Sequence, residues 1–279
     1  MLGAPVSETL LLRHRLGYWP RIRSPRSFNE RIAYRRLFDH DPRFAKFTDK
    51  WAVREYVERT VGAEVLNPLL ASAERFDDLP WDELPDAFVV KATHGCGWNH
   101  FVYRRSEDER RIVRAKAYRW LSSVYGRSTH EPWYASIPPR LVVEPLLTDR
   151  RYSPPADFKC FTFGGRAHWF EVVRNRFADP IVTFYDRDWR AQKWSHHFLP
   201  APDDVAPPTH LGRLIEVAEA LAKPFPFVRV DLYCPDDLRV VFGELTFAPS
   251  AGRRPFLPRE ADFELGGLWA DALRRGVAT

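Results

Sequence analysis

The sequence predicts an α+β protein, because its strand patterns occur as neighbouring pairs and its helical patterns occur in separate blocks. Strand pairs joined by short turns occupy about residues 88–103, 157–173 and 226–247. Apolar residues at helical spacing occupy about 28–38, 48–61, 106–124 and 211–223. Strands joined by short turns pair antiparallel, so we expect antiparallel sheets with helices packed against them.

The composition is that of a folded protein of enzyme size. The 279 residues allow one large domain or two to three subdomains. The formal charge of +5 suits phosphate-bearing ligands without requiring nucleic acid. Three cysteines without a CxxC pair argue against a disulfide framework or a structural zinc site. No run approaches the roughly 18 apolar residues of a membrane span, and no signal peptide is evident, so we expect a cytoplasmic protein.

The amino-terminal helices are basic. The first, about Phe28 to Phe38, carries Arg31, Arg35 and Arg36, which we interpret as a solvated face. The second is expected to begin at Thr48, whose hydroxyl can accept a free backbone amide.

A glycine-rich loop follows the first apolar strand. Phe88, Val89 and Val90 lead into Lys91, and the segment THGCGWN over residues 93–99 then joins a returning strand. Glycine lets backbone amides approach a ligand and lysine supplies charge, so the segment can hold phosphate. The alternative is an ordinary hairpin turn. The next helix is expected to open with a capping box formed by Ser106 and Glu109.

Two middle strands carry polar candidates. The strand from Arg140 to Glu144 is broken by Pro145, and its free backbone groups can read the edge of a flat base; an ordinary strand end is the alternative. In the strand from Asp157 to Phe163, alternation places Asp157 and Lys159 on one face.

The strand pair nearest the end of the chain carries charge where a buried strand should be apolar. If Cys234 pairs with Arg239, then Asp231 faces Phe242 and Arg229 faces Glu244. Arg229, Asp231 and Glu244 then share a face, where the charges need partners or a cation. A cross-strand ion pair is one interpretation, and a Mg²⁺ site, which takes hard oxygen ligands, is the other.

In their order along the chain, these motifs resemble the ATP-grasp superfamily. They are Asp49-Lys50, FVVK with THGCGWN, Val143-Glu144-Pro145, Asp157-Phe158-Lys159, VRVDLY and GELTFAPSAG. They are similar to its teichuronopeptide-biosynthesis-like branch over about residues 27–269. The resemblance implies an ATP-grasp fold in which the nucleotide is held between two antiparallel-sheet subdomains. It divides the chain into a reduced helical subdomain (1–67), a lid with the glycine loop (68–142) and a carboxy-terminal subdomain with the Mg²⁺-binding strands (143–279).

The resemblance also implies roles for individual residues, with ATP and Mg²⁺ as cofactors. Lys50 and Lys91 match the lysines on the α- and β-phosphates. Asp231 and Glu244 match the Mg²⁺ carboxylates, and Thr246 stands where the superfamily usually has an asparagine ligand. The mobile loop of the family matches Thr93, His94, Gly95 and Gly97, and the hinge that holds adenine matches Val143, Glu144 and Leu146. Asp157 matches the ribose-binding acid. Lys159 and Arg174 are candidates for the γ-phosphate, and Arg229 matches the basic residue near the transferred phosphoryl group.

The activity implied is ATP-dependent ligation of a carboxylate to an amine through an acyl phosphate. The substrate would be an amino acid, a peptide or a cell-surface polymer precursor, in a bacterial polysaccharide pathway. The alternatives are a glycan-modifying transferase or kinase and a non-catalytic nucleotide- or glycan-binding scaffold. We expect the acceptor pocket to use the amino-terminal helices, residues 184–197 and residues 251–258. No nucleic acid or membrane span is expected, and a homodimer is left open.

Overall fold

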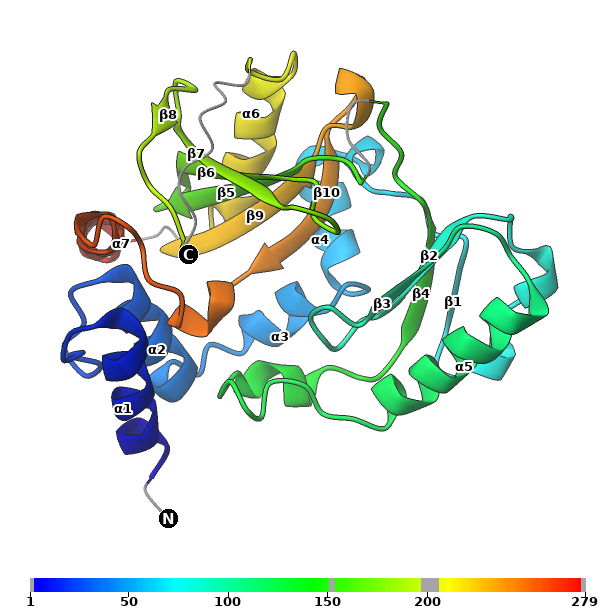
Figure 1. Ribbon diagram of the computed structural model, residues 1–279, viewed down its shortest axis with the longest axis horizontal. Coiled ribbons are helices and arrows are strands. Elements are labelled where there is room, and N and C mark those ends of the chain that lie inside the picture. The colour runs from blue at the N-terminus through cyan, green and yellow to red at the C-terminus, as the bar shows by residue number, and fades with distance from the viewer. Residues whose placement is uncertain (1–2, 151–153, 197–205, 277–279) are drawn as a thin grey trace. The chain divides into compact units, whose positions relative to one another are not determined.

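The structure is a computed structural model that describes residues 3–150, 154–196 and 206–276. The chain forms two compact units. One comprises residues 1–40 and 148–279, and the other comprises residues 41–147. The α+β class is confirmed, with a four-stranded and a six-stranded sheet in the described residues, both antiparallel (Figure 1). The three-part division predicted above stays a prediction.

The smaller unit is a sheet with one long helix on it. Its strands run in the order β1-β4-β2-β3. Helix α5 packs on the face that carries Phe88, Val90 and Ala92, and these residues join its buried stripe in one core. The strands alternate, so Lys91 lies on the other face. The elements are α3 (Arg43–Thr48), α4 (Val53–Val61), β1 (Ala71–Ala73), β2 (Phe88–Ala92), β3 (Asn99–Val102), α5 (Glu107–Leu121) and β4 (Leu141–Pro145).

The larger unit is built on the six-stranded sheet, with strand order β10-β9-β5-β6-β7-β8. Helix α6 contacts β5, β6 and β9. Helices α2 and α7 contact each other, and their aromatic side chains cover part of the sheet. The elements are α1 (Ala4–Leu16), α2 (Phe28–Phe38), β5 (Asp157–Phe163), β6 (Arg166–Arg174), β7 (Ile181–Asp186), β8 (Ala191–Gln192), α6 (Leu211–Ala222), β9 (Phe227–Tyr233), β10 (Val241–Thr246) and α7 (Glu260–Arg275).

Phe28, the first residue of α2, organises the aromatic core of the larger unit. Its ring lies 4.9 Å from that of Phe227 and 5.8 Å from those of Phe161 and Trp269. Phe161 and Phe227 share a sheet face with Lys159 and Asp231, because Phe161 lies two residues from Lys159 on β5 and Phe227 lies four residues from Asp231 on β9. One end of this face is therefore hydrophobic core, and the other end carries charge.

The basic helix α2 is not a solvated face, contrary to our interpretation. Arg35 and Arg36 are buried, at 3% and 1% exposure. Arg35 donates to the carbonyls of Phe227 and Phe247, both at 3.0 Å. Arg36 donates to Glu8 at 2.5 Å. Long cationic side chains can be buried where tertiary carbonyls and a carboxylate receive them, and sequence spacing does not reveal those partners.

The predicted helix starts were also wrong in part. Thr48 ends α3, and α4 begins only at Val53, because the carboxylate of Asp49 accepts the amide of Trp51 in the intervening turn. Ser106 does accept the amide of Glu109 at 3.1 Å. The carboxylate of Glu109 binds His100 at 2.7 Å instead of completing the box. A full capping box occurs at Ser27 and Glu30.

Glu8 gives a direct test of how the larger unit is held together. It is 1% exposed and accepts from Arg36 and from Arg253, at 2.6 Å in the latter case. Burial by itself would raise the pKa of Glu8, but the two arginines outweigh it and lower the pKa. A carboxyl whose pKa falls on folding stabilises the protein above its unfolded pKa, and that contribution is lost as pH falls through the folded pKa.

We therefore expect Glu8→Gln to lower the free energy of unfolding at pH 7 by about 3 kcal/mol, because two cations lose their buried partner. The difference in unfolding free energy between the variant and the unmodified protein should shrink when the pH falls below the usual pKa range of carboxyl groups. Urea unfolding at pH 7 and pH 3 measures both effects. Glu55→Gln is the control, because Glu55 is 63% exposed and its ion pairs are on the surface. An equal loss at both pH values would contradict the assignment.

Candidate functional site

The charged end of the six-stranded sheet is organised by Arg229 and Asp231 on β9. Arg229 donates from Nε and from Nη2 to the two carboxylate oxygens of Asp231, both at 2.6 Å. The residues are 9% and 3% exposed. A bidentate guanidinium–carboxylate pair fixes both side chains. Arg229 and Lys159 together outweigh the effect of burial and lower the pKa of Asp231, so the carboxylate stays ionised.

Lys159 on β5 extends this cluster across the sheet. Its Nζ contacts Asp157 and lies 3.4 Å from Asp231, its partner in the ladder. The two carboxylates outweigh burial and raise the pKa of Lys159, which keeps it charged. Burial, with the nearby charge of Asp231, raises the pKa of Asp157. Arg176 also reaches Asp157, at 3.2 Å.

Glu244 and Thr246 on β10 complete the arrangement. Arg229 Nη2 donates to the hydroxyl of Thr246 at 3.1 Å, and that hydroxyl donates to Glu244 at 2.8 Å. The structure therefore brings together six of the predicted residues in the larger unit: Asp157, Lys159, Arg229, Asp231, Glu244 and Thr246.

The pairing of β9 with β10 differs from the predicted register. Glu244 lies opposite Asp231, and Thr246 lies opposite Arg229. A register shift between Phe242 and Glu244 places the extra residue, Gly243, in the ladder. A Cβ at Gly243 would lie 2.9 Å from the carbonyl oxygen of Asp231, so glycine permits this close approach. The predicted common face for the three charged residues is nevertheless what the contacts show.

Arg174 does not join this cluster among the described contacts. It is 7% exposed, and its Nε and Nη2 have no hydrogen-bond partner in the described part of the chain. Arg176, two residues later, makes the contact instead. Glu171, the ladder partner of Lys159, is the other residue that sequence reasoning missed. Its position as the one acidic residue in the apolar segment FEVV could have marked Glu171 as a candidate.

A second cluster lies in the smaller unit, on the sheet face opposite α5. Lys91 donates to Glu144 at 2.6 Å. Arg54 lies 3.4 Å from the other oxygen of Glu144 and donates to the carbonyl of Asn67 at 2.8 Å. The side chain of Asn67 donates to the carbonyl of Pro145 at 3.0 Å. Arg54 and Asn67 come from outside the predicted motifs, and no local pattern marked them.

Lys50 is tied to the glycine loop. Its Nζ donates to the carbonyl of Gly95 at 2.5 Å, and its backbone amide donates to the carbonyl of Thr93 at 3.4 Å. His94 is buried, with its Nε2 2.9 Å from the carbonyl of Trp120. Burial lowers the pKa of His94 and favours the neutral ring. The first part of the loop, residues 93–95, is thus held by both Lys50 and α5.

The hinge candidates take different positions. Glu144 is in the Lys91 cluster, whereas Val143 is fully buried in the core under α5. The carbonyl of Val143 accepts the amide of Leu70 at 2.8 Å. Leu146 follows β4 and is half-buried. In the predicted acceptor segments, Arg253 binds Glu8, and residue 197 lies outside the described residues.

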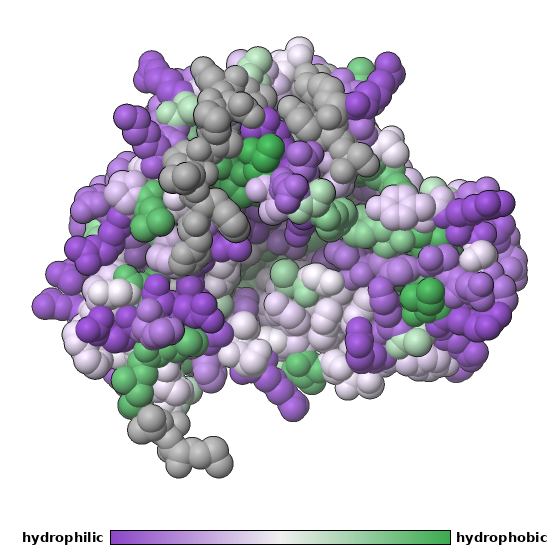
Figure 2. Space-filling model, in the orientation of Figure 1, coloured by the Kyte–Doolittle hydropathy of each residue, from purple (hydrophilic) through white to green (hydrophobic). Residues whose placement is uncertain are grey.

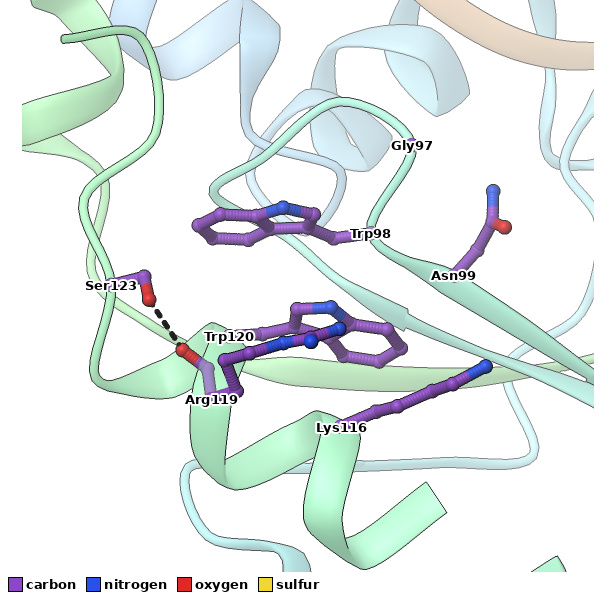
Figure 3. A pocket seen from close by; sticks show the side chains of 7 residues that line it. All are labelled: Gly97, Trp98, Asn99, Lys116, Arg119, Trp120 and Ser123. Carbon is purple, nitrogen blue, oxygen red and sulfur yellow. Dashed lines mark hydrogen bonds between the residues drawn. The ribbon is translucent and has the colours of Figure 1, made fainter. Parts of the chain in front are cut away.

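Beside the glycine loop lies a pocket of about 390 Å³ (Figure 3). Gly97, Trp98 and Asn99 line one side, and Lys116, Arg119, Trp120 and Ser123 from the α5 end line the other. Trp98 packs on Gly95, where an added Cβ would lie 2.4 Å from the indole. This packing fixes the position of the backbone that receives Lys50.

The sequence matches the family model described as TupA-like ATPgrasp over residues 30–270. The chain belongs to the TupA-like ATP-grasp family. A search of curated proteins finds no match. In the described residues, no helix is both long enough and apolar enough to cross a membrane.

Solved structures resemble this ATP-grasp chain at low identity. A D-alanine–D-alanine ligase from Bacillus anthracis in complex with ATP is 16% identical, with a TM-score of 0.49, over 82% of this chain and 67% of that one. The ADP complex of the N5-carboxyaminoimidazole ribonucleotide synthetase PurK is 14% identical, with a TM-score of 0.45, over 77% and 46%. The ligase PsnB with a precursor variant, Mg and ADP is 11% identical, with a TM-score of 0.43, over 84% and 60%. The chain thus spans less than half of the PurK chain.

The contact between Gly95 and Trp98 leads us to predict how substitutions in the loop change the unfolding free energy. We expect Gly95→Ala to cost about 1–3 kcal/mol of unfolding free energy, because the new methyl displaces the indole. Trp98→Ala should relieve that clash, so the double variant should be more stable than the sum of the single effects by about 1 kcal/mol. Thermal and urea unfolding of the four proteins measure the coupling.

Gly97→Ala is the matched control. Gly97 has a φ of 70° and no neighbour within 4 Å of an added Cβ. It should lose stability through backbone strain and show no coupling to Trp98→Ala. Coupling of equal size at Gly97 would remove the steric explanation.

Proposed function

We propose that this protein is an ATP-dependent ligase that joins a carboxylate to an amine. Two observations support the proposal: membership of the ATP-grasp family and the preorganised arrangement of Arg229, Asp231, Glu244 and Thr246. The arrangement carries the proposal, because a buried carboxylate and two partly exposed oxygen ligands beside a fixed guanidinium suit chemistry on phosphate and carboxylate groups.

In the proposed reaction, a carboxylate oxygen of the substrate attacks the γ-phosphorus of ATP and ADP leaves. The nitrogen of the amine then attacks the acyl carbon, inorganic phosphate leaves, and the amine loses a proton. Neither step requires a nucleophile from the protein. Catalysis then depends on positioning and on stabilising the charge that develops.

The donor set on β9 and β10 fits Mg²⁺ when phosphate oxygens complete the coordination. Asp231 and Glu244 supply carboxylates and Thr246 supplies a hydroxyl, and Glu244 has a partly exposed side chain. In the described residues, no group of three His, Cys, Asp or Glu side chains could hold a metal alone. Mg²⁺ prefers one or two carboxylates together with substrate phosphates, which is the set offered. When bound, the ion would offset charge on the phosphates.

The other residues take proposed roles that follow the family resemblance. Lys50 and Lys91 would bind the α- and β-phosphates, with the loop residues Thr93, His94, Gly95 and Gly97 beside them. Glu144 and Leu146 would bind adenine, with Val143 supporting them from the core, and Asp157 would bind ribose. Arg229 is held by Asp231 and would stabilise the oxyanion, while Lys159 would contact the γ-phosphate. Arg176 is a better-placed candidate than Arg174, because it reaches Asp157.

The substrates would be an amino acid, a peptide or a precursor of a bacterial surface polymer, as in teichuronopeptide or polysaccharide synthesis. An ADP-release screen with pooled carboxylates and amines, read with product masses, tests this. Release of ADP that needs both components supports ligation. A stable phosphorylated sugar would instead identify a kinase, and ATP binding without turnover would identify a scaffold.

We expect Glu244→Gln and Asp231→Asn each to lower turnover about 10²-fold or more, because each removes charge from the proposed metal-binding face. ADP release across a Mg²⁺ titration measures the effect. Glu216→Gln, on the exposed side of α6, is the control. Unchanged turnover in both test variants, with intact thermal unfolding, would remove these residues as ligands.

We expect Lys91→Met to raise the Kd for ATP at least about tenfold, because one charge-assisted phosphate contact is lost. Isothermal titration calorimetry measures the affinity. Lys46→Met serves as the comparison, since Lys46 is 49% exposed and pairs only at the surface with Glu55. An equal effect of both substitutions would point to general charge rather than to a phosphate contact.

A further inference from the structure

The first 26 residues carry most of the net charge of the protein. They contain five arginines, at positions 13, 15, 21, 23 and 26, and one acidic residue, Glu8. Their formal charge is +4, against +5 for the whole chain. Glu8 is buried and bound to Arg36 and Arg253, so it does not offset the arginines at the surface. None of the five arginines forms an ion pair within the described residues.

Apolar side chains lie exposed among these arginines. Helix α1 buries Leu12 and Leu16 in its own small core, yet it also presents Val6 and Leu10 to solvent, at 49% and 48% exposure. Trp19 follows the helix and is 63% exposed. A helix that is apolar on two sides usually has both sides covered. We call the area formed by Val6, Leu10, Arg13, Trp19, Arg21 and Arg23 the α1 surface; Figure 2 shows hydrophobic colour over α1 next to a strongly hydrophilic band.

The segment that presents Trp19 is held in place. Glu30 is fully buried and accepts the backbone amides of Arg21, Arg26 and Ser27 at 2.7, 2.7 and 3.0 Å. Arg13 lies over the Trp19 ring at 5.3 Å, and Arg23 lies over the Phe38 ring at 4.7 Å. The exposure of the indole and the guanidinium groups is therefore built into the fold rather than arising from a loose loop.

A hollow of about 600 Å³ separates α1 from this segment. Its walls include Val6, Leu10, Trp19 and Ile22, and Arg21 and Arg23 stand at the same hollow. Apolar walls with unpaired arginines match a ligand that combines an apolar chain with a negative head. Tryptophan and arginine are also the side chains that favour the boundary between lipid and water.

We propose that the α1 surface docks the protein on an anionic phospholipid membrane. The apolar side chains would enter the boundary between head groups and acyl chains, and the arginines would bind phosphate groups. A soluble polyanion does not account for the whole surface, because it would bind the arginines and leave Val6, Leu10 and Trp19 exposed to water. The proposal does not depend on the ligase activity.

The test uses the full chain and sedimentation with vesicles. Vesicles of phosphatidylcholine with 30% phosphatidylglycerol are compared with vesicles of phosphatidylcholine alone, in 0.1 M salt. We expect binding to the anionic vesicles only. Arg21→Glu with Arg23→Glu should weaken it at least about tenfold, and Leu10→Ser with Trp19→Ser should weaken it several-fold. All four side chains sit at the surface, and far-UV circular dichroism confirms that the variants fold.

The control variant makes the same charge change elsewhere. Arg104 and Arg127 are exposed and have no ion pair in the described residues, so Arg104→Glu with Arg127→Glu reverses two charges in the other unit. It should retain binding. The proposal fails if anionic vesicles are not bound, or if the control weakens binding as much as the arginine pair does. It also fails if the Leu10 and Trp19 variant binds unchanged, which would indicate a polyanion site.

Discussion

The ion pair between Arg229 and Asp231 is the interaction on which the charged face depends. Burying the Arg229 guanidinium on the sheet is costly unless its charge is paired, because desolvation of an unpaired charge is unfavourable. Asp231 takes two of its donors and Thr246 takes a further contact. The bulge at Gly243 makes this possible, since it moves Glu244 opposite Asp231 and Thr246 opposite Arg229. The glycine at position 243 thus determines which oxygen atoms of β10 lie opposite Arg229 and Asp231 on β9.

The rigidity of that face has its origin in the aromatic core beside it. Phe161 and Phe227 continue the strands that carry Lys159 and Arg229, and both rings pack against Phe28. Arg35 links the same core to the backbone of β9 through the carbonyl of Phe227. A strand held at one end by packing cannot slide in register without exposing its aromatic residues. The hydrophobic half of the face therefore positions the polar half.

The sequence predicted the strands β2 to β6, β9 and β10 and the helices α2, α5 and α6 well, because alternation and helical spacing are local signals. It also predicted the common face of Arg229, Asp231 and Glu244, because acidic residues within an apolar hairpin can be recognised from the sequence alone. The register was wrong by one residue between the turn and Phe242 and by two residues from Glu244 on, since the turn is longer than predicted and the bulge at Gly243 adds one residue. Arg54, Asn67 and Arg176 were missed for the same reason: their roles arise from tertiary contacts. The elements β1, β7 and β8 are short or edge strands and gave little pattern.

The arginines show most clearly where sequence patterns stop being informative. Arg35 and Arg36 on α2 look like a solvated basic face, yet one donates to two strand carbonyls and the other to buried Glu8. Arg21 and Arg23, only a few residues earlier, remain at the surface. The difference lies in available acceptors, because Glu8 is bound by Arg36 and Arg253 and Glu30 is bound by backbone amides. Arg21 and Arg23 thus keep their charge at the surface without an ion pair in the described residues, and the membrane docking proposed above would place lipid phosphates beside them.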